Sequence, residues 1–254
     1  MDYFRKRIII ADLDGTLSVS KSPIDGEMAA LIMELLKSRS LAVISGGSYL
    51  QFQKQFLPSL PRNADLSRLY LFPTCATAFY KYDGNGWAEV YAERLSESER
   101  RKIFDAFDAA LKETSFDFSQ LSYGARIEDR DTQISFSALG QKCPYEIKSK
   151  WDPDHRKREV IVAALAPRIP EFEVRIGGTS TIDVTRKGID KEYGINKISE
   201  YLGFTREEML FVGDALFEGG NDYPAKKTGV DCMQVSGPEE AKALLRDVIN
   251  TRRR

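Results

Sequence analysis

The sequence predicts an α/β protein with a parallel sheet that is interrupted by an inserted α+β domain. Three observations lead to this prediction. Near the N-terminus, short apolar runs alternate with segments of helical periodicity, which is the pattern of βαβ units. The middle of the chain instead combines strands of alternating polarity with separate helices, which indicates a largely antiparallel sheet. The strand–helix alternation then returns, so we expect both flanking segments to build one core.

The first segment reads as three strands that alternate with two helices. The first helix follows Asp25 and carries apolar residues at helical spacing, and the second, near Tyr49, stops at Pro58. This alternation predicts right-handed βαβ units and a parallel sheet. The expected strands are Arg7–Leu13, Leu41–Ile44 and Leu69–Phe72.

The pattern changes after the turn signal Asp83-Gly84-Asn85-Gly86. Ser96 and Glu99 form a capping box that opens a helix, and a second helix from about Asp154 is ended by Pro167. The inserted domain is therefore expected over residues 86–186, with the core formed by 1–85 and 187–254. Its expected strands are Ala125–Glu128, Gln133–Ala138, Glu171–Ile176 and Ser180–Val184.

The last segment returns to the first pattern. A helix is expected from about Asp190 to Leu202, and a buried strand follows over Met209–Gly213. A short strand near Cys232–Val235 and a helix over Pro238–Ile249 complete the core.

Composition excludes several classes of function. The net charge of −1 among 254 residues gives no basic field for nucleic acid. No apolar run approaches the roughly 20 residues that cross a bilayer, and the N-terminus does not resemble a signal peptide. Three separated cysteines suit a reduced, cytoplasmic protein and form neither a disulfide framework nor a zinc motif. The single histidine, His155, leaves acid–base chemistry to carboxylates or lysines.

Two carboxylates follow the first buried strand, in the stretch Asp12-Leu13-Asp14-Gly15-Thr16. At the carboxyl end of a strand, both can point into the crevice where open α/β sheets bind ligands. Such carboxylates can bind a hard cation and attack a phosphoryl group. Gly15 permits the turn, and the Thr16 hydroxyl can bind a phosphate oxygen. The competing interpretation is an ordinary turn after a strand.

Three further features lie at expected strand ends or helix starts. Ser45-Gly46-Gly47-Ser48 offers amides and hydroxyls to a phosphate, although it also fits an ordinary βα turn. Lys191 begins a helix and could equally be a solvated lysine. Gly213-Asp214 and Gly219-Gly220-Asn221-Asp222 could be loop residues. The four features together, in this order, are much more specific than any one alone.

In this combination the chain resembles the haloacid dehalogenase (HAD) superfamily of phosphoryl-transfer enzymes, which implies a Rossmann-like core and an inserted cap domain. The cap resembles that of subfamily IIB, and the whole chain is most similar to eukaryotic-type phosphomannomutases. The stretches that carry this second resemblance are Ile127–Arg130, Phe136–Gly140, Ile176–Asp183, Gly188–Lys191 and Gly213–Asp222.

The resemblance implies a mechanism. Asp12 would attack phosphorus and form an aspartyl-phosphate, and Asp14 would protonate the leaving sugar oxygen. Lys191 would hold the phosphoryl oxygens. The implied cofactor is Mg²⁺, bound by Asp12, the Asp14 carbonyl, Asp214 and, through water, Asp222. The implied phosphate-binding residues are Thr16, Ser45, Gly46 and Asn221.

The cap implied by the resemblance would bind the rest of the substrate. Arg130 matches a phosphate-binding arginine, and Thr181 and Asp183 match positions that contact sugar hydroxyls. Gln141 and Lys148 stand where the mutase pattern has further arginines. Gln141 lacks the positive charge, and Lys148 keeps the charge but lacks the guanidinium fork. The remaining departures are Lys21, in place of an arginine, and Thr74-Cys75-Ala76, in place of an Asn-Gly step.

The weakened set of cap arginines favours a magnesium-dependent phosphatase acting on a phosphorylated sugar or a related small metabolite. The alternative is a phosphomannomutase or phosphoglucomutase that interconverts hexose 1- and 6-phosphates. A third hypothesis, a catalytically silent HAD-like binding protein, is disfavoured because the Asp12, Asp14, Lys191 and Asp214 set is intact. The relatives allow a homodimer through the cap, and no nucleic-acid or membrane partner is expected.

Overall fold

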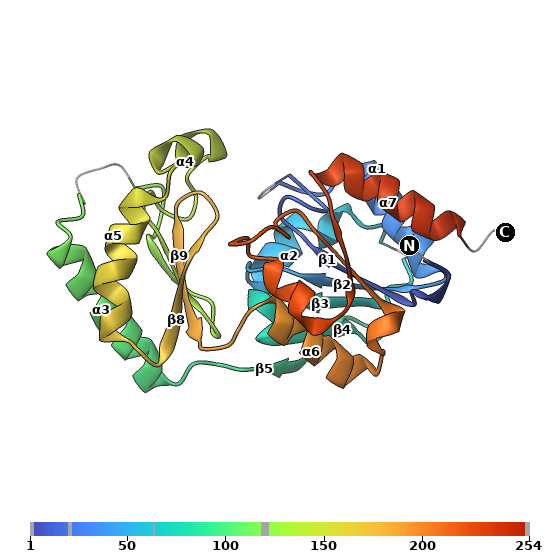
Figure 1. Cartoon of the computed structure of the whole chain (residues 1–254), viewed down its shortest axis with the longest axis horizontal. Helices are drawn as coiled ribbons and strands as arrows, with labels where there is room; N and C mark the ends of the chain where they lie inside the picture. The colour runs from blue at the N-terminus through green and yellow to red at the C-terminus, as the bar shows by residue number, and fades with distance from the viewer. Residues whose placement is uncertain (1–2, 20–21, 63, 118–121, 252–254) are drawn as a thin grey trace. The chain divides into compact units, whose positions relative to one another are not determined.

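The computed structural model describes residues 3–19, 22–62, 64–117 and 122–251, and it divides into two compact units. The core unit contains the residues up to Ala92 and those from Ile189 onward, and the cap unit contains Glu93–Gly188. Residues 86–92, which are expected in the insertion, lie in the core unit, and residues 187–188, which are expected in the core, lie in the cap unit. The fold class is confirmed: a mostly parallel central sheet and a separate antiparallel sheet (Figure 1).

The core sheet has seven strands among the described residues, in the order β11-β10-β1-β2-β3-β4-β5. The first five in this order are parallel, and β4 and β5 extend the sheet as an antiparallel hairpin. The strands are β1 (Ile8–Asp12), β2 (Ser40–Ile44), β3 (Leu69–Phe72), β4 (Ala78–Tyr82), β5 (Trp87–Ala92), β10 (Met209–Gly213) and β11 (Asp231–Gln234).

Helices cover both faces of this sheet (Figure 1). Alternate residues of β1 face opposite sides, as the pleat requires. Ile9 and Ala11 pack in the apolar cluster with α1, α2 and α7, whereas Ile8 and Ile10 pack in the cluster with α6. Burial on both faces explains why β1 is apolar along its length before Asp12. The helices are α1 (Gly26–Leu36), α2 (Tyr49–Gln55), α6 (Lys191–Leu202) and α7 (Pro238–Asn250).

The β4–β5 hairpin is absent from the sequence-based expectation. Its turn at residues 83–86 is expected from the sequence. In the structure, the Asp83 side chain accepts hydrogen bonds from the amides of Asn85 and Gly86, both at 2.9 Å. The two strands were not recognised, because β5 is an edge strand whose residues are partly or fully exposed. Exposed edge strands lack the contiguous apolar run that marks a parallel strand.

The cap unit packs two helices against one face of a four-stranded antiparallel sheet of order β6-β7-β9-β8. Ile134 and Phe136 of β7 and Ile182 and Val184 of β9 join this apolar core, so the alternate residues face the other side. The short helix α4 was not expected. The elements are α3 (Glu97–Glu113), β6 (Ile127–Asp129), β7 (Ile134–Ser137), α4 (Tyr145–Trp151), α5 (Arg156–Leu165), β8 (Phe172–Gly177) and β9 (Thr181–Arg186).

The expected capping box begins α3. The Ser96 hydroxyl accepts from the Glu99 amide at 3.3 Å, and the Glu99 carboxylate accepts from the Ser96 amide at 2.7 Å. Glu99 also receives two hydrogen bonds from Arg186, the last residue of β9. The Arg186 guanidinium lowers the pKa of Glu99 to about 2. This contact therefore joins the start of the helix to the end of the sheet.

The C-terminus of α3 has the hydrogen bonds of a Schellman motif. The Ser115 amide donates to the Lys112 carbonyl at 3.1 Å, and the Phe116 amide donates to the Leu111 carbonyl at 2.9 Å. Ser115 has a φ of 50°, in the left-handed region that favours glycine. The Schellman motif is therefore formed with serine at the position where glycine is usual.

Replacing Ser115 with glycine is expected to stabilise the protein by about 1 kcal/mol, because the left-handed backbone costs an L-residue roughly that amount. Urea unfolding followed by circular dichroism measures the change. Ser115→Ala is the matched control, since alanine retains the β-carbon and should leave stability within about 0.5 kcal/mol. A glycine variant no more stable than the alanine variant would contradict the prediction.

Candidate active site

An ammonium group and two carboxylates meet, buried, at the carboxyl end of the core sheet. Asp12 ends β1, Lys191 begins α6, and Asp222 follows β10 in the chain; their exposed fractions are 4%, 1% and 0%. The Lys191 Nζ donates a hydrogen bond to Asp12 Oδ1 and lies 3.4 Å from Asp222 Oδ1. It also donates to the Ile44 carbonyl at 3.1 Å. Lys191 is therefore a buried ion-pair partner and not a solvated helix lysine.

The sheet topology explains why residues distant in sequence meet here. β1 lies between β2 and β10 and is parallel to both, so the three strands end at the same edge. The helix α6 must also approach this edge closely. A β-carbon on Gly194 would lie 2.2 Å from Ile44 Cδ1, so a larger residue would displace the buried Ile44 side chain where α6 crosses β2. That close approach lets Lys191 reach across the end of β2.

Burial and charge oppose each other at this pair. Burial raises the pKa of Asp12, and the Lys191 ammonium opposes that shift. For Lys191, burial favours the neutral amine, but the carboxylates of Asp12 and Asp222 outweigh it and raise the pKa. Asp214 also has a raised pKa, because of burial and the nearby Asp222. The ammonium of Lys191 thus stays charged within a site that holds several acidic groups.

Three carboxylates of this site form a cluster suited to a divalent cation. Asp12, Asp214 and Asp222 each offer an oxygen, and these atoms lie within 4.8 Å of one another. Asp222 Oδ1 is buried without a hydrogen-bond partner, and one ammonium faces all three acids. An all-oxygen donor set with excess negative charge fits Mg²⁺.

Two glycines let the carboxylates come this close. A β-carbon on Gly15 would lie 2.5 Å from Asp214 Oδ2, and one on Gly213 would lie 2.3 Å from Asp222 Oδ2. Gly15 also has a φ of 90°, which other residues rarely adopt.

The Asp14 side chain lies outside this carboxylate cluster. Its two oxygens accept hydrogen bonds from the side-chain amides of Gln51 and Gln55, at 3.1 and 2.9 Å. From the sequence, Asp14 is expected to transfer a proton through its side chain and to bind the metal through its main-chain carbonyl. The contact of the Asp14 side chain with α2 bears on the proton-transfer role and places no such constraint on the carbonyl.

The four expected phosphate-binding residues have different surroundings. Thr16 is buried, and its hydroxyl donates to Asp214 Oδ1 at 3.4 Å. The buried Ser45 hydroxyl accepts from the Gly47 amide at 3.0 Å. Gly46 is half-buried beside it, whereas Asn221 is exposed next to the buried Asp222. The first three therefore lie at the strand edge that carries the acids, and the side chain of Asn221 lies in solvent.

The segment Thr74–Ala76 holds the Ser45 loop in place. The Cys75 amide donates to the Ser45 carbonyl at 2.8 Å, and the Thr74 amide donates to the Gly47 carbonyl at 2.9 Å. All three residues of the segment have positive φ, between 49° and 67°.

On the cap unit, Arg130 and Asp183 are neighbours. The Arg130 guanidinium donates to Glu128 at 2.7 Å and lies 3.9 Å from Asp183 Oδ1. Thr181, on the same strand as Asp183, donates its hydroxyl to the Gly177 carbonyl. These residues occupy the sheet face opposite the apolar core of the cap.

Gln141 and Lys148 contact each other. The Lys148 side chain is buried, and its ammonium donates to the Gln141 carbonyl at 3.1 Å. The Gln141 amide donates to the carbonyls of Ser135 and Arg126, at 3.3 and 3.4 Å. Both side chains therefore bind main-chain oxygens within the cap unit.

Comparison with known proteins agrees with this geometry. The sequence pattern of the family described as "Eukaryotic phosphomannomutase" matches residues 28–251. The chain belongs to the eukaryotic phosphomannomutase family. A phosphomannomutase of Spinacia oleracea is 29% identical over 221 residues, covering 85% of this chain and 84% of the relative. One of Schizosaccharomyces pombe is 25% identical over 256 residues, covering 97% and 96%.

Solved structures with low sequence identity share the fold. An N-terminally truncated IMP-nucleotidase of Plasmodium falciparum is 18% identical, with a TM-score of 0.71, and the match covers 98% of this chain and 72% of that one. A haloacid dehalogenase-like hydrolase of Bacteroides thetaiotaomicron is 14% identical, with a TM-score of 0.65, and the match covers 96% and 99%. The HAD fold of this family member is therefore shown by structure as well as by sequence.

Two polar residues of this site were not predicted from the sequence. Gln51 and Gln55 of α2 bind Asp14, and Gln55 is itself buried. A glutamine pair spaced four residues apart marks one face of a helix. That spacing alone is also common on exposed helices, so only the tertiary contact reveals a role. Of the departures from the family pattern, Lys21 lies outside the described residues.

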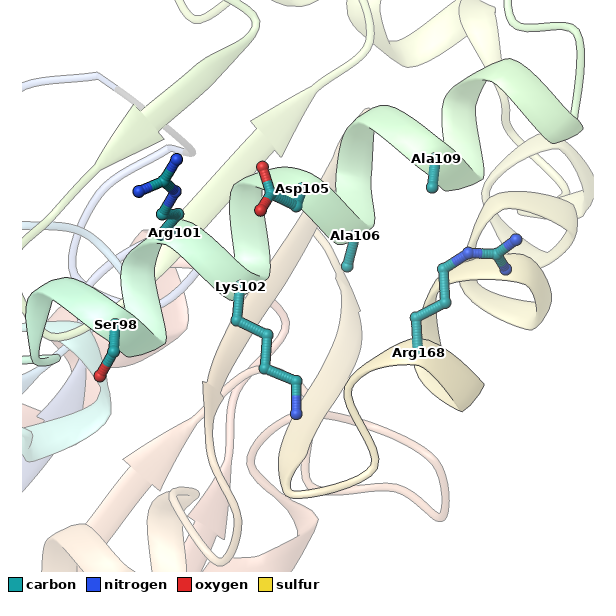
Figure 2. A pocket seen from close by; sticks show the side chains of 7 residues that line it. All are labelled: Ser98, Arg101, Lys102, Asp105, Ala106, Ala109 and Arg168. Atoms are coloured by element: carbon teal, nitrogen blue, oxygen red, sulfur yellow. The ribbon is translucent and has the colours of Figure 1, made fainter.

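A separate pocket lies on the cap unit, along α3 and the turn at Arg168 (Figure 2). Of its three basic residues Arg101, Lys102 and Arg168, the last two pair with Glu171 and Glu113 respectively. The pocket therefore belongs to the charged surface of the cap unit, and Asp105 is the one acidic residue among those that line it. Within the described part of the chain, no helix has the length and apolarity required to cross a bilayer.

Replacing Lys191 with methionine is expected to lower the free energy of unfolding of the metal-free protein by about 3–5 kcal/mol. The reason is that Asp12 and Asp222 would stay buried without their ammonium partner. Added Mg²⁺ should recover part of the loss. Urea unfolding with EDTA and with Mg²⁺ measures both effects, and Lys54→Met, on the exposed side of α2, is the control. An unchanged unfolding midpoint of the metal-free variant would refute the structural role of the ammonium.

Proposed function

We propose that this protein is a magnesium-dependent phosphoryl-transfer enzyme that acts as a phosphatase on a phosphorylated sugar or a related small metabolite. The observation that carries the proposal is the buried Asp12 carboxylate beside Lys191, Asp214 and Asp222. A carboxylate in this position can attack phosphorus while cationic groups offset the negative charge of the phosphate. The phosphomannomutase relatives supply the substrate class.

In the first half of the reaction, a bond forms between an Asp12 oxygen and phosphorus. The bond from phosphorus to the leaving sugar oxygen breaks, and Asp14 gives that oxygen a proton. In the second half, Asp14 takes a proton from water, the water oxygen bonds to phosphorus, and the bond to Asp12 breaks. The products are the free sugar and inorganic phosphate.

The remaining residues of the core hold charge in place. Lys191, kept protonated by its two acidic neighbours, faces the oxygens of the phosphoryl group, and the hydroxyls of Ser45 and Thr16 bind them. Asp12, Asp214 and Asp222, with the Asp14 carbonyl, would hold Mg²⁺. When bound, the cation supplies positive charge that offsets the charges of nucleophile and phosphate.

The phosphatase is preferred over a mutase because of the cap unit. A mutase must hold a second phosphate that does not react, and guanidinium groups do this by bidentate hydrogen bonds. Lys148 and Gln141 bind main-chain carbonyls instead, and Lys148 is 1% exposed. Because these side chains bind main-chain carbonyls, we expect the cap to bind a second phosphate more weakly than a set of arginines would. Water is then the expected acceptor of the phosphoryl group.

The alternative is a phosphomannomutase or phosphoglucomutase. Membership of the family favours it, as does Arg130, which remains next to Asp183 on the cap sheet. A silent binding protein is disfavoured because the buried Asp12–Lys191 pair and the acidic cluster are complete.

The variant Asp12→Asn is expected to lose turnover by on the order of 10³-fold or more, because the amide keeps the shape but is a poor nucleophile. Rapid-quench labelling should find phosphoenzyme in the wild type and none in the variant. EDTA should abolish wild-type turnover, and Mg²⁺ should restore it. Asp65→Asn, at an exposed carboxylate, controls for a general effect. Full turnover by Asp12→Asn, or turnover unchanged by EDTA, would exclude the mechanism.

Product analysis is expected to separate the two activities. With mannose 1-phosphate, a hexose bisphosphate activator and Mg²⁺, release of inorganic phosphate should exceed formation of mannose 6-phosphate. The reason is the weak hold of the cap on a second phosphate. A coupled assay for each product measures the ratio. Isomer formation faster than phosphate release would establish the mutase in place of the phosphatase.

A further inference from the structure

Two glutamines of α2 bind both oxygens of Asp14. The Gln51 Nε2 donates to Asp14 Oδ2 at 3.1 Å, and the Gln55 Nε2 donates to Asp14 Oδ1 at 2.9 Å. We call Gln51 and Gln55 the glutamine pair. The pair contacts Asp14 from a different element of the core than the one that carries it, so the orientation of Asp14 depends on α2.

The glutamine pair is itself held in place. Gln51 Nε2 donates to Gln55 Oε1 at 2.8 Å, and Gln55 Nε2 donates to the Ser18 hydroxyl at 3.0 Å. Gln55 is 5% exposed. A β-carbon on Gly47 would lie 2.2 Å from Gln51 Oε1, so a larger residue in the loop before α2 would displace this amide. A buried amide with both polar atoms engaged has little freedom to rotate.

The backbone around Asp14 is also closed. The Gly15 amide donates to the Ser18 carbonyl at 2.8 Å, and the amides of Leu17 and Ser18 both donate to the Leu13 carbonyl at 3.0 Å. With the main chain fixed in this way, rotation of the Asp14 side chain is the freedom that remains. The two amides restrict that rotation, because they bind both carboxylate oxygens.

We infer that Gln51 and Gln55 are positioning residues for Asp14, holding its carboxyl group apart from the metal-binding carboxylates and in place for proton transfer to the leaving oxygen. This inference rests on the proposed function. Without the pair, Asp14 would lose the two hydrogen bonds that orient its carboxyl group, and the group would no longer be held in the position for proton transfer. Misplacing a proton donor by about 1 Å can cost as much as 10²-fold in rate.

The test compares two phosphate esters that differ in their need for a proton. A sugar oxygen must leave as an alcohol, whereas p-nitrophenolate is a stable anion that leaves unaided. The variants are Gln51→Leu and Gln55→Leu, which remove the amide at similar volume. Gln53→Leu, at an exposed glutamine of the same helix, is the matched control. Rapid-quench kinetics measure phosphoenzyme formation from mannose 1-phosphate and from p-nitrophenyl phosphate.

For Gln51→Leu and Gln55→Leu, we expect the rate of phosphoenzyme formation from mannose 1-phosphate to fall about 10- to 100-fold. The rate from p-nitrophenyl phosphate should change less than about threefold, and KM should stay constant for both esters. Gln53→Leu should match the wild type. If Gln55→Leu fails to fold, Gln55→Met and the half-buried Gln51→Leu provide the same comparison.

Equal losses on the two esters would mean that the glutamine pair supports the site only structurally, and no loss on either would mean that it has no role. Either result overturns this inference and leaves the proposed function intact. A wild-type protein that forms no phosphoenzyme from either ester would remove the proposed function, and this inference with it.

Discussion

The buried contact of Lys191 with Asp12 and Asp222 is the interaction on which the rest of the site depends. Charged groups enter a protein interior only when partners offset the loss of hydration. Here one ammonium is shared between a residue that ends a central strand and a residue in the loop after its neighbour. The same ammonium binds the last carbonyl of β2, so it joins three adjacent strand ends. Gly194 leaves room for the Ile44 side chain where α6, which begins at Lys191, crosses β2.

Much of the core could be read from the sequence because its signals are local. A contiguous apolar run, a turn and a helix start mark the end of a parallel strand, and Asp12, Ser45 and Asp214 all follow such runs. Lys191 could be placed at a helix start but not near Asp12, since that meeting depends on the order of strands. The β4–β5 hairpin and α4 were not predicted because they lack a contiguous apolar run.

The glutamine pair shows a second limit. Nothing in the residues around Gln51 and Gln55 distinguishes them from the exposed Gln53 between them. Gln51 and Gln55 differ from Gln53 because they lie on the face of α2 that turns toward the loop of Asp14. The burial of Phe52 and Phe56 determines which face this is. Similarly, Lys148 could be expected to extend into solvent or to a ligand, and it is the fold of the cap that buries it against a carbonyl. Polar residues obtain such roles from tertiary contacts.

The split of the core across the chain governs the order in which its parts become available during synthesis. β1 is among the first strands to be made, yet its pairing with β10 requires residues from 209 onward. The intervening cap unit has its own sheet and apolar core, and it is complete at Gly188, before any part of α6 exists. Asp12 thus lacks Lys191 and two of its acidic neighbours for most of translation. A nascent chain therefore carries Asp12 long before the ammonium and the two further carboxylates that surround it in the folded protein.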